Sequence, residues 1–168
     1  MREADSYLSS EIIRHLKQIK RNSTVPTADY VFLPHITDAY VQASGTSLEN
    51  ALASAGKALF DTLCDLNSIT PKLTERVVVE GHDEIALVYN WLESLLLKFE
   101  LEQKVYSEFK VDKIARSSQG LRTTAEISGE PFDRQKHGPK VEVKAVTYHK
   151  MEVVQEPETT TLRFILDL

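Results

Sequence analysis

The sequence contains very little cysteine and no apolar run long enough to cross a bilayer. Cys64 is the one cysteine among 168 residues, which excludes an internal disulfide and a thiolate metal cluster. It falls on the apolar face of a predicted helix, where a small buried side chain is the usual role. Residues 1–6 carry charges of both signs without a continuous apolar segment behind them, so neither a signal peptide nor a membrane span is predicted. We expect a cytoplasmic protein.

Excess positive charge and catalytic motifs are also missing. Lys and Arg number 20 against 25 Asp and Glu, a net charge of −5, whereas surfaces that bind nucleic acid show clustered Lys and Arg. Direct nucleic-acid binding is therefore not expected, and a metal ion or a basic protein partner suits the chain better. There is no phosphate-binding glycine loop with lysine and no nucleophile elbow. We predict that the protein is not an enzyme.

The sequence does contain strand and helix patterns for one domain, and its 42% hydrophobic content is enough for a core. One helix begins with Thr46 and Glu49 in capping-box spacing, and a second, expected to be the most buried, has Asp83 and Glu84 in its first turn. A continuous apolar run predicts a buried strand at 30–34, a β-branched run predicts one at 73–80, and the remaining patterns predict strands at 39–44, 105–111, 121–127, 141–154 and 160–168. This order predicts an α+β fold, a mainly antiparallel sheet with two helices packed on one face.

The N-terminus adds an amphipathic, locally basic pattern to this domain. Residues 1–22 are predicted to be helical, because Leu8, Ile12, Leu16 and Ile19 recur at helical spacing. Basic residues occupy other positions of the same wheel: Arg14, Lys17, Lys20 and Arg21. Such a helix packs its apolar stripe on the domain or docks on a partner. We therefore divide the chain into an N-terminal helical extension, 1–28, and a folded domain, 29–168.

Polar groups follow one predicted strand and end another. The apolar run that stops at Pro34 is followed by His35, Thr37 and Asp38, and the last strand carries Asp167 one residue before Leu168. If the two strand ends meet, Asp38, Asp167 and the terminal carboxylate and carbonyl of Leu168 form an all-oxygen site of the kind that calcium or magnesium prefers. The shell is incomplete, so water, backbone carbonyls or a partner would supply further ligands. In the alternative, Asp38 caps a turn and Asp167 is the polar end of a strand.

Three further residues are candidates for partner binding. His35 is either a hydrogen-bonded residue at the strand end or part of the site. Glu142 and Lys144 fall on one face of a predicted strand, as an ordinary solvated pair or as a salt-bridged wall of the same site. His137 and His149 lie outside any tight metal-ligand spacing, so no zinc motif is predicted.

Several short segments carry a resemblance to a known family. They are Phe32-Leu-Pro-His35 with Asp38, Leu48-Glu49, Ala58-Leu-Phe-Asp61, Trp91-Leu-Glu93, Phe99-Glu100, Gly129-Glu130, Phe132-Asp133 with His137, Glu142-Val-Lys-Ala-Val-Thr-Tyr-His149 and Ile165-Leu-Asp-Leu168. With these segments, the chain from about Tyr30 to Leu168 resembles archease. The family usually has Thr-Ala where this chain has Ile36 and Thr37, which keeps the acid in place and alters the turn before it.

The resemblance implies a small cytosolic accessory protein rather than an enzyme. Such a protein binds calcium or another divalent cation and activates the GTP-dependent tRNA-splicing RNA ligase by promoting its guanylylation and repeated turnover. The family's metal ligands fall on Asp38, Asp167 and Leu168, the same positions that oxygen chemistry at the strand ends suggests. The alternative is a stand-alone small metal-dependent enzyme or chaperone that uses the same acidic site.

Overall fold

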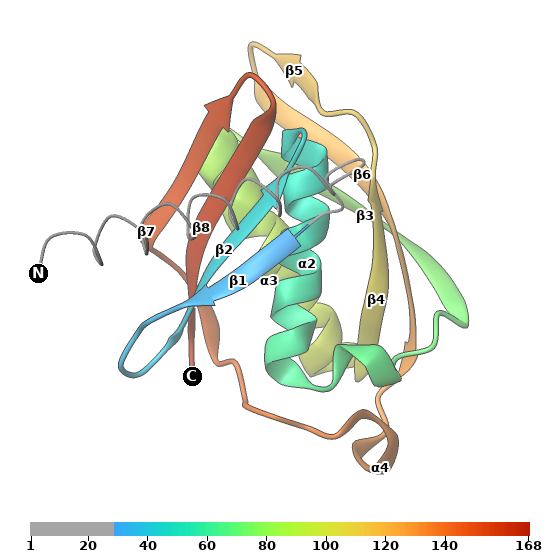
Figure 1. Ribbon diagram of the computed structural model, residues 1–168. Helices are drawn as coiled ribbons and strands as arrows, with labels where there is room; N and C mark the ends of the chain where they lie inside the picture. Colours follow the sequence, from blue (N-terminus) through green and yellow to red (C-terminus); the bar gives the residue numbers. More distant parts are fainter. Residues whose placement is uncertain (1–28) are drawn as a thin grey trace, which may run out of the picture.

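The computed structural model describes residues 29–168, so the predicted helix at 1–22 and the extension to residue 28 lie outside the described residues. Within 29–168, eight strands form two antiparallel sheets, and two long helices lie between them (Figure 1). Sheet A has the order β1 (Asp29–Leu33), β2 (Ala39–Gly45), β8 (Thr159–Asp167) and β7 (Ala145–Glu156). Sheet B has the order β3 (Leu73–Gly81), β6 (Gly120–Pro131) and β4 (Lys104–Val111), and the short β5 (Ala115–Ser117) also pairs with β6.

The α+β class and the antiparallel pairing confirm the sequence prediction. The arrangement is richer than one sheet, because α2 (Leu48–Leu63) and α3 (Glu84–Glu102) each contact strands of both sheets. The helices therefore pack on one face of each sheet and form the middle of three layers (Figure 1). The described residues also include two short helical segments, η1 (Leu66–Ser68) and α4 (Arg134–His137). No helix within 29–168 is long and apolar enough to cross a membrane.

The helix α2, not α3, is the more buried, contrary to the prediction from the wide apolar stripe of α3. Twelve of its sixteen residues are buried, against seven of nineteen in α3. The reason is its content of small side chains, which let both sheets approach closely. At Gly56, for example, an added Cβ would lie 2.9 Å from the ring of Phe109 on β4.

The start of α2 also differs from the predicted capping box. Ser47 is the N-cap, and its hydroxyl accepts a hydrogen bond from Asn50 N at 3.3 Å. Glu49 instead accepts from Ile114 N at 3.0 Å and ties α2 to the segment that follows β4. Ser47, not Thr46, therefore caps the helix, and Glu49 makes a tertiary hydrogen bond instead of a capping one.

The core lies between the sheets around Trp91 of α3. Its indole N–H donates to the backbone oxygen of Leu52 at 2.8 Å and so joins the two helices inside the core. Phe60 and Phe109 stack with ring centroids 6.0 Å apart, and Tyr106 lies edge-on to Phe60 at 5.5 Å. This packing fixes the helices against sheet B, while Val41, Phe164 and Leu166 close the core from sheet A.

Candidate metal and partner-binding site

The antiparallel pairing of β2 with β8 brings the two predicted strand ends to the same end of sheet A. The ladder runs from Gly45 opposite Thr160 to Ala39 opposite Leu166. The ladder stops one residue short of Asp38 and Asp167, so both acids lie at the same end of this strand pair, and Leu168 follows Asp167 directly. We call Asp38, Asp167 and Leu168 the strand-end site. The pairing of β2 with β8 thus brings Asp38 and Asp167 to the same end of the sheet, although more than a hundred residues separate them in the sequence.

Lys144 joins this site from the other side of β8. Its backbone N–H donates to the backbone oxygen of Asp167 at 2.8 Å, and its Nζ donates to the backbone oxygen of Leu168 at 2.7 Å. The predicted strand at 141–154 begins only at Ala145, so Lys144 belongs to an extended segment that leads into β7. Glu142 and Lys144 are therefore not in a strand, but both are exposed on either side of buried Val143, as expected for two residues on one face.

His35 and Asp38 form a local hydrogen-bonded turn between β1 and β2. Asp38 N donates to His35 Nδ1 at 3.3 Å, and the same ring nitrogen lies 3.4 Å from Asp38 Oδ2. The hydroxyl of Thr37 donates to that carboxylate oxygen at 2.9 Å, while Ile36 is 99% exposed. These contacts occupy Oδ2 and leave Oδ1 without a hydrogen bond within residues 29–168. Asp38 thus closes a turn and still offers an oxygen to a ligand.

The donor set of the strand-end site consists of oxygens only. Two carboxylates and one backbone oxygen fit a hard cation such as calcium, which takes about six to eight oxygen ligands, but they fill less than half of its shell. Within 29–168 no group of three or more His, Cys, Asp or Glu side chains is arranged to hold a metal. The ammonium of Lys144 already places one positive charge against the Leu168 oxygen. The Leu168 oxygen is therefore already engaged by a positively charged side chain.

Glu142 lies apart from these contacts. It lines a cavity of about 620 Å³ together with Phe99, Glu100 and Phe132, between the C-terminal end of α3 and the segment before β7. Within the described residues it makes no ion pair with Lys144. The structure therefore brings Asp38, Asp167, Leu168, Lys144 and His35 to one end of sheet A and leaves Glu142 beside it.

A buried cluster of charged residues at the end of β6 was not predicted from the sequence. Glu130, 3% exposed, accepts hydrogen bonds from Thr70 N and Lys72 Nζ, both at 2.7 Å, and from Lys136 Nζ. His137 is fully buried, and its Nε2 lies 3.1 Å from Glu130 Oε1. The cluster fastens α4 to the end of β6. The sequence shows only polar residues within a Gly- and Pro-rich segment at this point. Thr70 and Lys72, which bind Glu130, lie far away in the chain, so the sequence does not reveal the cluster.

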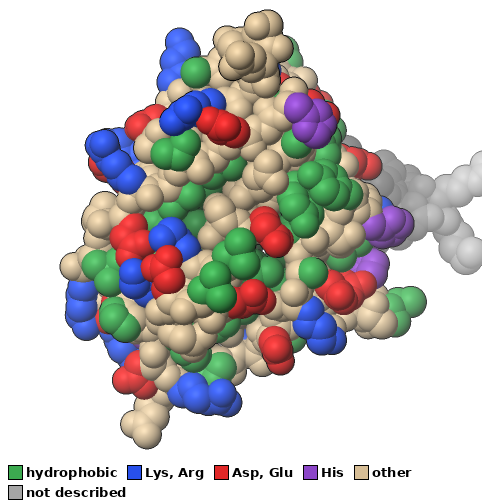
Figure 2. All heavy atoms as spheres, turned by 180° about the vertical axis from the view of Figure 1, so that it is seen from behind, with side chains coloured by type: hydrophobic (Ala, Val, Ile, Leu, Met, Phe, Trp, Pro, Cys, Tyr) green, Lys and Arg blue, Asp and Glu red, His purple; other side chains and the backbone are tan. Residues whose placement is uncertain are grey.

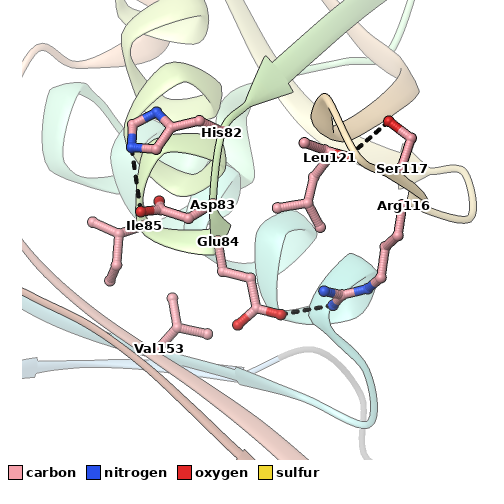
Figure 3. A pocket seen from close by; sticks show the side chains of 9 residues that line it. His82, Asp83, Glu84, Ile85, Arg116, Ser117, Leu121 and Val153 are labelled. Carbon is pink, nitrogen blue, oxygen red and sulfur yellow. Dashed lines mark hydrogen bonds and ion pairs between the residues drawn. The ribbon is translucent and has the colours of Figure 1, made fainter.

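A second cavity, of about 490 Å³, lies at the N-terminal end of α3 (Figure 3). It borders Val153, which pairs with Leu162 near the beginning of β8, and so lies at the opposite end of that strand from Asp167. Its charged side chains engage one another, since Arg116 donates to Glu84 at 2.7 Å and His82 lies 3.3 Å from Asp83. We assign no function to this cavity.

The described residues define a small α+β protein in which two antiparallel sheets enclose two long helices. The Archease protein family (MTH1598/TM1083) matches the chain over residues 30–168, and the chain belongs to this family. It is 40% identical to protein archease of Pyrococcus abyssi over 124 residues, 74% of this chain and 87% of the relative. It is 34% identical to protein archease of Methanothermobacter thermautotrophicus over 139 residues, 83% and 98% of the two chains.

Solved structures show the same fold. The solution structure of Methanobacterium thermoautotrophicum protein 1598 superposes with a TM-score of 0.70 at 31% identity and covers 83% of this chain and 98% of that one. The crystal structure of an archease from Thermotoga maritima, described as a possible chaperone, gives a TM-score of 0.53 at 16% identity, covering 81% and 94%. The second likeness supports the fold alone.

Proposed function

We propose that this protein is a cytoplasmic accessory factor that activates the GTP-dependent tRNA-splicing RNA ligase, promoting guanylylation of the ligase and its multiple turnover. A divalent cation, calcium or a related ion, would be held by Asp38, Asp167 and Leu168. The observation that supports the proposal is the register of β2 and β8, which brings both acids to one end of sheet A in a member of the archease family.

The surroundings of the site support a role in presenting oxygens to a partner. The contacts of His35 and Thr37 orient one oxygen of Asp38 and leave the other free within the described residues. Lys144 holds the backbone oxygen of Leu168 at the same edge. When bound, a calcium-type ion supplies positive charge that draws the carboxylates together. The carboxylates of Asp38 and Asp167 would favour association with a basic active-site entrance of the ligase through complementary charge.

The one cysteine of the chain supports an accessory role over nucleophilic catalysis. Cys64 is fully buried at the end of α2, and burial raises its pKa to about 11. At neutral pH it is therefore a thiol rather than the thiolate that attacks substrates.

The competing function is a stand-alone metal-dependent enzyme or chaperone that uses the same acids. This candidate differs from an accessory factor in having an activity of its own. Stimulation of the ligase without any activity of the protein alone separates the two. A pull-down with the ligase, in calcium and again in chelator, tests whether the cation is needed for the encounter.

The direct test is the number of ligation rounds per ligase molecule with Asp38→Asn and Asp167→Asn variants. Asparagine keeps the shape and removes the charge, so both variants should fold and stimulate turnover at least tenfold less than the wild type. Glu158→Gln is the matched control, because it removes the same charge from an exposed position in the turn between β7 and β8, at the far end of the sheet. Wild-type turnover with either folded Asp variant would refute the assignment.

A further inference from the structure

The strand β3 forms an edge of sheet B, and β6 is the one strand that pairs with it within 29–168. The pairing is regular over the whole of β3, from Leu73 opposite Gly129 to Gly81 opposite Leu121. The other edge strands of the two sheets are short or irregular, since β1 has five residues and β4 and β7 each contain a register shift. Short strands and bulges discourage the addition of a further strand at an edge. The free side of β3 lacks both features.

The unpaired backbone groups of β3 belong to every second residue. Asp112 N donates to Thr124 O at 2.8 Å, so the backbone of Thr124 in β6 faces β4 rather than β3. Val78 lies opposite Thr124, and because hydrogen-bonded and non-bonded pairs alternate in an antiparallel ladder, the N–H and C=O of Val78 point to the free side. Glu80 agrees with this assignment, since its backbone oxygen accepts from the side chain of Asn90 in α3 at 2.7 Å. The residues that face the free side are Thr74, Arg76, Val78 and Glu80.

The side chains of these residues lie on the solvent face of sheet B and include two opposite charges. Val78 is 52% exposed and lies between Arg76 and Glu80. On β6, Glu126 lies 3.2 Å from Arg76 and Arg122 lies 3.0 Å from Glu80, and all four side chains are exposed. Figure 2 shows from behind how basic and acidic side chains lie next to one another on the left side of the molecule, where sheet B lies. Exposed ion pairs are weak, so each charge is available to a second partner.

We propose that a second copy of this chain adds its own β3 to the free side of β3, so that the two copies of sheet B become one continuous sheet. The two strands run antiparallel about a two-fold axis at Val78, which lies opposite Val78 of the second copy. In the same register Arg76 lies opposite Glu80 of the second copy, and the symmetry repeats this pair on the other side of the axis. Each of these residue pairs exchanges backbone hydrogen bonds. Asn90 uses one lone pair of the Glu80 oxygen, and the other accepts from the added strand.

The charges select this register. A slip of two residues sets Val78 against Arg76 or Glu80, and a slip of four sets Arg76 against Arg76 or Glu80 against Glu80. Like charges directly opposite each other destabilise a strand pair, whereas opposite charges stabilise it. Because Arg76 lies opposite Glu126 and Glu80 opposite Arg122 within each copy, the joined sheet carries a row of alternating sign across four strands. The row consists of Glu126 and Arg76 of one copy followed by Glu80 and Arg122 of the other.

The test is self-association of the full chain with the charges of β3 exchanged. A single strand pair buries less surface than a standard protein interface, so sedimentation equilibrium should give a dissociation constant between about 10 μM and 1 mM. Arg76→Glu and Glu80→Arg each set like charges against one another on both sides of the axis. Either variant alone should therefore dimerise at least tenfold more weakly than the wild type. An equal mixture of the two variants restores opposite charges and should form a heterodimer within threefold of wild-type affinity.

The mixture separates recognition between copies from any effect of the substitutions on folding, because both variants are present in it unchanged. A wild-type chain that stays monomeric at about 1 mM would overturn the proposal, as would a mixture that stays monomeric. Single variants that dimerise as tightly as the wild type would do the same. Glu108→Lys is the matched control, since it reverses an exposed charge on β4, at the opposite edge of sheet B, and should leave the dissociation constant unchanged.

Amide hydrogen exchange locates the contact on the chain. The backbone N–H groups of Arg76 and Val78 should exchange at least tenfold more slowly at high than at low protein concentration, because the added strand bonds them. A dimer that leaves these rates unchanged forms through another surface, and the proposal then fails. Ligase stimulation plays no part in these measurements, so their outcome is independent of the proposed function.

Discussion

Glu130 and His137 are buried side by side, with Glu130 Oε1 and His137 Nε2 3.1 Å apart. The other ring nitrogen of His137 accepts a hydrogen bond from Asp133 N at 2.8 Å, so the imidazole connects the end of β6 to both ends of α4. The segment that follows leads to Lys144, which holds Asp167 and Leu168. The cluster around Glu130 therefore anchors the start of the segment that carries Lys144.

Replacing Glu130 by glutamine should destabilise the protein strongly. The variant keeps the shape but removes the charge that Lys72, Lys136 and His137 surround, and breaking a buried ion pair costs about 3 kcal/mol. The measurement is the free energy of unfolding from urea titrations. Glu126→Gln is the control, because Glu126 and its partner Arg76 are 39% and 75% exposed and the pair is worth about 0.5 kcal/mol. Equal losses in the two variants would contradict the structural role of Glu130.

The same cluster should make folding stability depend on acid pH. Hydrogen bonds from Lys136 and Lys72 hold the pKa of Glu130 far below its usual value. Burial acts to raise the pKa of Glu75, but hydrogen bonds from Lys104 and Lys98 outweigh it and lower this pKa to about 2. A carboxyl with a lowered folded pKa stabilises the protein above its unfolded pKa and loses that contribution as the pH falls.

The free energy of unfolding should therefore fall as the pH drops from about 5 to about 2, since the unfolded carboxyls take up protons first. Glu130→Gln lacks one of these groups and should lose less stability over this range than the wild type. Urea titrations at several pH values measure both slopes. Identical slopes would mean that Glu130 titrates in the folded protein as it does in the unfolded chain.

The strand ends were predictable because local patterns determine them. Alternating residues in 39–44 and 160–168 show which side of each strand is buried, and pairing those sides leaves Asp38 and Asp167 at one edge. The division into two sheets was not predictable, since period-two alternation shows the buried face of a strand but not its neighbours. The Glu130 cluster was hidden for the same reason. Its partner Lys72 lies 58 residues away, and only the pairing of β3 with β6 brings the two together.

Gly129, next to this cluster, should not tolerate a side chain. A Cβ at this position would lie 1.8 Å from the backbone oxygen of Val105 on β4, and backbone cannot move aside as a flexible side chain can. Gly129→Ala should lower the free energy of unfolding by more than about 3 kcal/mol through overpacking. In Gly138→Ala the cost should be about 1 kcal/mol, because the added Cβ meets nothing within 4 Å and only the positive φ of 54° is strained. Thermal or urea unfolding of both variants checks the order.

Lys144 should compete with a divalent cation for the strand-end site. Its ammonium donates to the Leu168 oxygen at 2.7 Å, so an ion that uses the same oxygen must approach a positive charge or displace it. A divalent cation about 4 Å from a unit positive charge is repelled by about 2 kcal/mol in water, which corresponds to roughly thirtyfold in affinity. Lys144→Gln should therefore bind calcium up to about thirtyfold more tightly, as measured by calorimetry. Lys140→Gln is the control, because Lys140 pairs with Asp61 instead.

Weaker or unchanged calcium binding would give a different role to the contact between Lys144 and Leu168. Weaker calcium binding in Lys144→Gln would mean that the lysine's main effect is to hold the Leu168 oxygen in place for the ion, and repulsion would then be the smaller effect. Unchanged binding would show that the ion does not use this oxygen, because removing a charge so close to a bound cation cannot leave its affinity untouched. In that case Asp38 and Asp167 alone would have to supply the protein ligands, and Asp38→Asn with Lys144→Gln should bind no more tightly than Asp38→Asn.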